Sequence, residues 1–116
     1  MSHITTENHL VTLINVFTVE PKDQSTLVDL LGQATDEVMK DLPGFISANI
    51  HRSNDGTRVV NYAQWRSRAD FEAMMQNPAA QEHMRDVTKI ARVDPHIYRV
   101  TEVVEVAETA GRATFQ

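Results

Sequence analysis

Apolar and polar residues alternate along two stretches of this chain, and one asparagine interrupts the apolar row of each stretch. The first stretch is 10–19, LVTLINVFTV, and the second is 58–66, RVVNYAQWR. Alternation with many β-branched and aromatic residues predicts strands. One face of the first strand is expected to hold Val11, Leu13, Asn15, Phe17 and Val19. One face of the second is expected to hold Val59, Asn61, Ala63 and Trp65.

The two asparagines raise the question of which groups bond to their side-chain amides. A buried amide without hydrogen-bond partners costs on the order of 1–3 kcal/mol, so either the fold or a ligand must satisfy it. Asn15 and Asn61 could form a structural pair that bridges neighbouring strands, which is at least as common a role for buried asparagines as catalysis. A ligand contact is the alternative.

In the first half of the chain, helical spacing and turn residues predict a helix followed by a β-hairpin. Apolar residues at three- and four-residue spacing predict a helix over 24–42, with Asp23 as its N-cap and Pro43-Gly44 as its end. The segment 45–53, FISANIHRS, is a predicted strand that the turn 54–56, Asn-Asp-Gly, joins to the strand 58–66 as a hairpin. In this strand one face is expected to hold Phe45, Ser47, Asn49 and His51.

The second half shows two capped helices and a strand. Ser67, with Asp70 three residues later, predicts a helix N-terminus, and Asn77-Pro78 predicts a second helical piece over 78–91. Asp94-Pro95 is expected to break this second helical piece, and a last strand is expected over 96–106.

The predicted order is strand, helix, strand, strand, helix, strand, which is the ferredoxin-like βαββαβ pattern of an α+β protein with an antiparallel sheet. We expect one domain over 9–106, a flexible N-terminus over 1–8, and a tail over 107–116 that extends onto a partner subunit or stays mobile. The outer face of the sheet also carries apolar residues, so a homodimer that packs sheet against sheet is expected. These outer residues are Val60, Tyr62, Val100 and Val104.

Composition excludes several classes of function. The 116 residues carry a net charge of −5 without a basic cluster, which argues against a nucleic acid or an anionic membrane as partner. The chain has no cysteine, and its five histidines have no helical ligand spacing, so a metal site is not expected. No apolar run is long enough to span a bilayer, and the polar start MSHITTENH lacks the layout of a secretory signal. A cytoplasmic protein is therefore expected.

Two motifs, LINVF and DLPGFISANIHRSNDGTRVVNYAQW, resemble the antibiotic biosynthesis monooxygenase family. The resemblance covers 10–105 and is most specific in the PGF-to-His segment and in NYAQW. Within the family, the chain is most similar to the small anthrone oxygenases of aromatic polyketide pathways. The resemblance implies a dimeric ferredoxin-like α/β-barrel with a pocket between sheet and helices in each subunit. It also implies oxidation of an anthrone to a quinone with dioxygen, without flavin, haem or metal.

The resemblance further implies a set of site residues. Asn15, Asn61 and Trp65 match the family's functional residues at their motifs. Neutral amides can donate to a developing oxyanion, and an indole offers a flat wall and one donor. Phe71 stands where a relative has tyrosine, so proton removal would fall to His51, to water or to the substrate's own acidity. The residues expected to bind substrate are His51, Phe17, Phe71, Met74 and Arg85.

Two other functions stay open. A haem-degrading oxygenase of the same superfamily would use a pocket asparagine and a helix histidine, roles that Asn15 and His83 could fill. That enzyme also needs a helix tryptophan, and Met74 stands at the comparable turn. A non-catalytic dimer that binds a small ligand is the third reading, in which Trp65 and the methionines are core residues.

Overall fold

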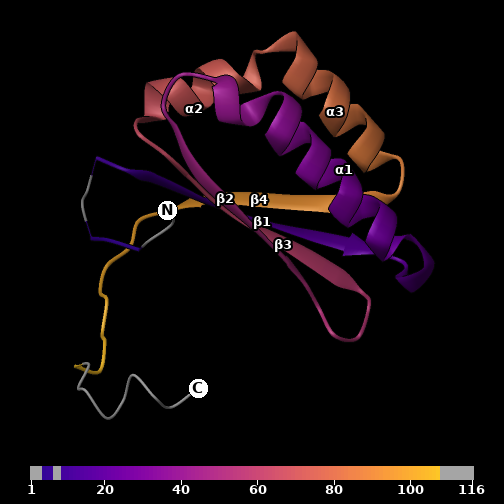
Figure 1. Cartoon of the computed structure of the whole chain (residues 1–116), viewed down its shortest axis with the longest axis horizontal. Coiled ribbons are helices and arrows are strands. Elements are labelled where there is room, and N and C mark those ends of the chain that lie inside the picture. Colours follow the sequence, from indigo (N-terminus) through magenta and orange to yellow (C-terminus); the bar gives the residue numbers. More distant parts are fainter. Residues whose placement is uncertain (1–3, 7–8, 108–116) are drawn as a thin grey trace.

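All neighbouring strands of the sheet pair antiparallel, and the helices cover one of its faces (Figure 1). The computed structural model describes residues 4–6 and 9–107. The strand order is β2-β3-β1-β4, so β2 and β4 are the edges of an open sheet. The regular elements are β1 (Val11–Val19), α1 (Gln24–Glu37), β2 (Phe45–Arg52), β3 (Arg58–Trp65), α2 (Arg68–Met75), α3 (Pro78–Thr88) and β4 (Ala91–Tyr98).

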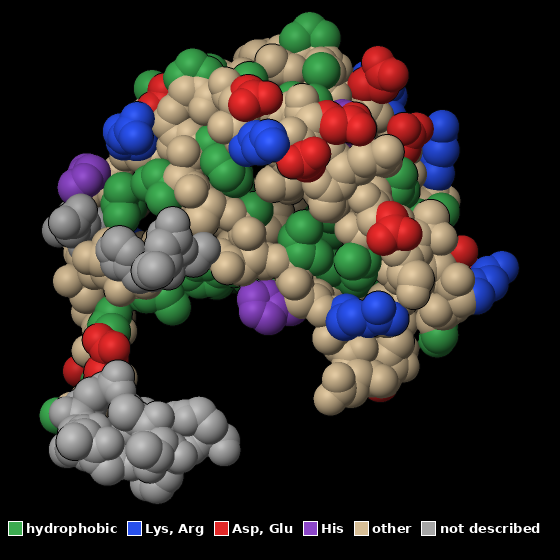
Figure 2. Space-filling view, in the orientation of Figure 1, with side chains coloured by type: hydrophobic (Ala, Val, Ile, Leu, Met, Phe, Trp, Pro, Cys, Tyr) green, Lys and Arg blue, Asp and Glu red, His purple; other side chains and the backbone are tan. Residues whose placement is uncertain are grey.

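This order confirms the predicted ferredoxin-like βαββαβ fold. The sheet within one chain does not close into a barrel, and a barrel of the implied kind would need a second subunit. Within the described residues, no helix is long and apolar enough to cross a membrane. On the face shown in Figure 2, acidic and basic side chains are interspersed, without a patch of one sign.

The helix caps were partly as expected. The Ser67 side chain accepts a hydrogen bond from the Asp70 amide at 3.1 Å, and the Asn77 side chain accepts one from the Ala80 amide at 3.1 Å. Asp23 precedes α1 but makes no side-chain cap. The prediction that this helix reaches residue 42 was wrong. Val38 leaves helical geometry, and the 3₁₀ turn Met39–Asp41 follows.

The last strand begins earlier than predicted, because Pro95 lies inside β4 instead of before it. α3 ends at Thr88, and β4 covers 91–98. A proline is tolerated here since β4 is an edge strand, which pairs with β1 alone and needs no donor on its other side. Residues 99–107 have no regular structure and lead away from the sheet (Figure 1). The rest of the predicted tail lies outside the described residues.

An irregularity at the start of β2 reverses the predicted faces of that strand. The register shifts between Phe45 and Ser47, so two residues of β2 oppose one of β3. After this bulge Ala48 and Ile50 share the inner face with Phe45 and pack on the core. Ser47, Asn49 and His51 pair with outer-face residues of β3, so His51 points away from the helices.

The apolar core consists of two clusters with the two asparagines between them. On β1 the clusters contain Leu13 and Phe17, and Asn15 separates these residues; on β3, Asn61 lies between Val59 and Ala63. Asn15 and Asn61 are direct partners in the antiparallel register. The predicted inner rows of β1 and β3 are therefore confirmed, and the two amides interrupt these rows at paired positions.

Candidate active site

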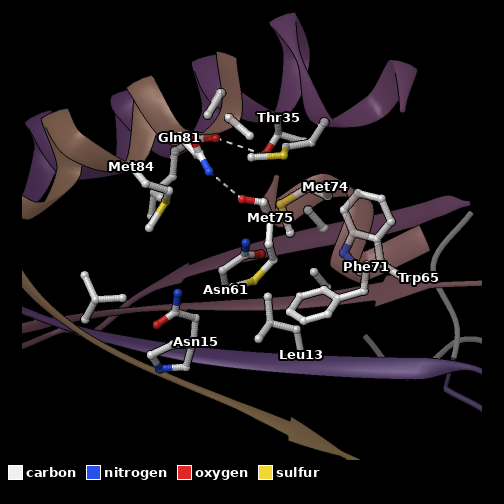
Figure 3. A pocket seen from close by; sticks show the side chains of 18 of the residues that line it. Leu13, Asn15, Thr35, Asn61, Trp65, Phe71, Met74, Met75, Gln81 and Met84 are labelled. Carbon is white, nitrogen blue, oxygen red and sulfur yellow. Dashed lines mark hydrogen bonds between the residues drawn. The ribbon is translucent and has the colours of Figure 1, made fainter. Parts of the chain in front are cut away.

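A cavity of about 470 Å³ lies between the sheet and the helices, above the two asparagines (Figure 3). This volume is within the range of small-molecule sites. Its floor comes from β1, β2, β3 and β4, and its other walls come from α1, α2 and α3. The cavity therefore occupies the gap that separates the two core clusters.

Neither asparagine side chain has a hydrogen-bond partner among the described residues. The Oδ1 atoms of Asn15 and Asn61 are buried without a partner, and neither side chain bonds to the described part of the chain. Asn15 is only 6% exposed. The structural reading, an amide pair that bridges two strands, requires a bond that is not formed. Since these oxygens are covered, the two amide NH2 groups are the donors available to a bound molecule at the cavity floor.

Trp65 closes one end of the cavity within an aromatic cluster. Its ring meets Phe45 edge to face, with centroids 5.4 Å apart, and Phe71 with centroids 6.5 Å apart. Trp65 is 2% exposed, so these contacts fix its position. The residue belongs both to the core and to the cavity wall, and it presents a rigid aromatic surface to a flat ligand.

Arg85 is the only charged side chain among the described residues that line the cavity. It projects from α3, is exposed, and forms no ion pair or hydrogen bond with the described residues. The other polar groups on the helix side are neutral, namely Thr35, Gln81 and Thr88. The cavity can therefore bind an anionic group at one place, since a guanidinium pairs well with a carboxylate or phenolate oxygen.

The structure brings together seven of the eight predicted site residues. Around the cavity lie Asn15, Phe17, Asn61, Trp65, Phe71, Met74 and Arg85. His51 does not line it; this residue is exposed on the outer face of the sheet, opposite Val60. His83 does not line it either, and its Nε2 atom lies 3.8 Å from the Glu37 carboxylate.

Sequence reasoning missed Phe45 and the residues that α1 and the following turn supply. Phe45 was not named as a site residue. Alternation placed it on the same face as His51, and the bulge separates the two residues. Thr35 and Met39 also line the cavity. Their positions depend on how α1 lies over the sheet, and helical spacing does not specify that placement.

Residues 10–86 match the model of a family described as antibiotic biosynthesis monooxygenase. Among curated proteins, the tetracenomycin-F1 monooxygenase of Streptomyces glaucescens is 46% identical over 101 residues. That similarity covers 87% of this chain and 90% of the relative.

Solved structures show the same fold. SnoaB, a cofactor-independent oxygenase from Streptomyces nogalater, has a TM-score of 0.76 at 18% identity, with 83% of this chain and 97% of that chain covered. ActVA-Orf6, a monooxygenase of Streptomyces coelicolor in complex with nanaomycin D, has a TM-score of 0.73 at 26% identity, with 85% and 93% covered.

Proposed function

Because the chain belongs to the antibiotic biosynthesis monooxygenase family, we propose that it oxidises an anthrone-like aromatic polyketide to a quinone with dioxygen and without a cofactor. The predicted family resemblance is confirmed by the family match and by the 46% identity to tetracenomycin-F1 monooxygenase. The observation that carries the proposal is the unpartnered amide pair on the floor of an apolar cavity. SnoaB, described as a cofactor-independent oxygenase, supports the absence of a cofactor.

The reaction requires an electron-rich anion held beside oxygen. An anthrone methylene loses a proton, the anion gives one electron to dioxygen, and the two radicals combine to a carbon-bound peroxide. Loss of water then leaves a ketone, so one oxygen atom enters the product and the other leaves as water. The amides of Asn15 and Asn61 would donate to the substrate oxygen on which the negative charge develops. Trp65 would hold the plane of the rings.

The described lining contains no carboxylate, histidine or tyrosine that could remove the proton. His51, one of the three bases considered, is on the other face of the sheet. Proton removal is therefore assigned to water or to the acidity of the substrate itself. An environment that stabilises the anion serves this chemistry better than a strong base, because the carbon acid is already activated by two aromatic rings.

The test is oxygen uptake by metal-stripped protein supplied with dithranol, a simple anthrone, while quinone formation is followed by absorbance. We expect a rate well above the spontaneous oxidation, with one oxygen molecule consumed per quinone formed. A rate equal to the spontaneous one, with protein that still binds the anthrone, would support the non-catalytic binding reading instead. The haem-degrading function is disfavoured because His83, the residue that would bind the iron, does not line the cavity.

Arg85 is assigned to bind an acidic substituent of the substrate. Replacing it with glutamine is expected to raise KM about 10-fold for an anthrone with a carboxylate, such as rhein anthrone, because a charged hydrogen bond contributes about 1.5–3 kcal/mol. The KM for neutral dithranol is expected to stay unchanged. Steady-state kinetics on both substrates measures this difference. Arg92→Gln, outside the cavity, is the matched control, and an equal KM change on both substrates would contradict the assignment.

We also infer a homodimer that packs through the outer face of the sheet. The centre of this face holds Ile14, Val16, Val60 and Tyr62, which are half-buried in the single chain. A second copy would cover this apolar centre, which the single chain leaves partly open to water. The cytoplasmic location stays a prediction.

Val60→Glu is expected to convert this dimer into a monomer, since it places two charges at the centre of the interface. The measurement is mass by light scattering after size-exclusion chromatography, at micromolar protein. Thr18→Glu, an exposed position on β1 at the margin of the sheet, is the control and should stay dimeric. A Val60→Glu protein that keeps the mass of the wild type would exclude this face as the interface.

A further inference from the structure

Four of the chain's five methionines line the same cavity. The chain has five methionines in total, and Met39, Met74, Met75 and Met84 line the pocket. They come from three separate parts of the helical layer, which are the 3₁₀ turn after α1, the end of α2, and α3. Figure 3 shows Met74, Met75 and Met84 pointing from the helices into the cavity above the asparagines.

Packing explains only part of this arrangement. Met84 packs on one core cluster and Met74 on the other, so both fill space as flexible methionines do. Met75, however, is 52% exposed while lining the cavity, and it adds little to the core. Since the chain lacks cysteine, these thioethers are also its most readily oxidised side chains. They surround the place where the proposed reaction makes a peroxide.

We propose that the cavity methionines, Met75 first, are a modification site that becomes oxidised to methionine sulfoxide during turnover. The inference rests on the proposed function, which supplies the oxidant. A carbon-bound hydroperoxide in the cavity transfers its outer oxygen to the thioether sulfur; the O–O bond breaks, an S–O bond forms, and the hydroperoxide is reduced to an alcohol. Sulfur loses two electrons, and the proton of the outer oxygen moves to the oxygen that remains on carbon, which becomes the alcohol.

Met75 is modified first because a sulfoxide needs room and hydration. A half-exposed side chain at the cavity wall offers both, whereas Met39, Met74 and Met84 are more enclosed. The sulfoxide is polar, and it would face a lining that is otherwise almost entirely apolar. Each oxidation therefore weakens binding of a flat apolar substrate. The enzyme then carries a limit on its number of turnovers, and methionine sulfoxide reductases can remove that limit.

The test follows wild-type protein through exhaustive turnover of dithranol with catalase present, which removes peroxide from the bulk solution. One tryptic peptide, residues 69–85, carries three of the four methionines, and residues 23–40 carry the fourth. We expect additions of about 16 Da, greatest at Met75 and rising with turnover number, and activity recovered by sulfoxide reductase. Met75→Leu, close in volume, should complete several-fold more turnovers, relative to its own initial rate, before it stops.

The outcomes separate the two proposals. If the protein consumes oxygen but its methionines stay unmodified, the oxidation site is overturned and the proposed oxygenase activity is not. The same holds if catalase abolishes the modification. Bound anthrone without oxygen uptake overturns the oxygenase, and the oxidation site with it. Protein incubated with the quinone product alone is the control, and the same additions there would show that turnover is not their cause.

Discussion

Replacing Asn61 with alanine is expected to lower kcat for anthrone oxidation by about 10²–10³-fold, the usual loss when one oxyanion donor is removed. The free energy of unfolding should stay the same or rise slightly. The reason is that the Asn61 side chain bonds to no other described residue, so its removal breaks none of the described bonds and relieves a buried unsatisfied oxygen. Oxygen uptake and urea denaturation of the same preparation measure the two effects.

Asn49→Ala is the matched control for this experiment. Asn49 lies on the neighbouring strand β2 but on the outer face, and its Nδ2 atom donates to the Tyr62 carbonyl oxygen at 3.3 Å. Its loss should cost about 1 kcal/mol of stability and leave oxidation unchanged. If Asn61→Ala kept full activity and lost stability, while Asn49→Ala behaved as described, the amide pair would be structural.

Trp65→Ala is expected to destabilise the fold by about 3–5 kcal/mol, as large-to-small substitutions of buried aromatic residues do. The side chain is 2% exposed and meets both Phe45 and Phe71 edge to face, so its removal opens a space that these rings cannot fill. Because Trp65 is the only tryptophan, unfolding is best followed by far-UV circular dichroism instead of fluorescence.

Trp65→Phe separates the role in packing from the role in catalysis. Phenylalanine keeps an aromatic contact with both neighbours, so a smaller loss of stability is expected, but it removes the indole N–H and part of the wall. At a temperature where the variant is fully folded, kcat/KM should still fall. A variant with wild-type kcat/KM would assign Trp65 to the core alone.

Alternation predicted the residues at the centre of the site because β1 and β3 pair over eight residue pairs without a shift in register. Asn15 and Asn61 were placed on inner rows from sequence alone, and the register puts them opposite each other. The same rule failed in β2. A bulge inserts one residue between Phe45 and Ser47, so Phe45 lines the cavity while His51, expected on the same face, lies outside it.

Proline and helix placement account for the other differences. Pro95 was expected to mark the break between the last helix and the last strand. A proline can instead lie inside a strand when that strand is at an edge, and strand order is a property of the whole fold. The contributions of Thr35, Met39 and Gln81 depend on how the helices lie above the sheet. Neither property is encoded in a local pattern.

The central position of β1 has a consequence for how the protein is made. Among the described strands, β1 leaves the ribosome first, and it pairs with β3 and with β4, the last of them. The pair Asn15 and Asn61 can form once residue 65 has emerged. The other edge of β1, which pairs with β4, stays unpaired until residue 98 has emerged. At about 5–20 residues per second, those 33 residues take about 2–7 s. During that interval a nascent chain exposes an unpaired, valine-rich strand edge, and its folding would depend most on chaperones then.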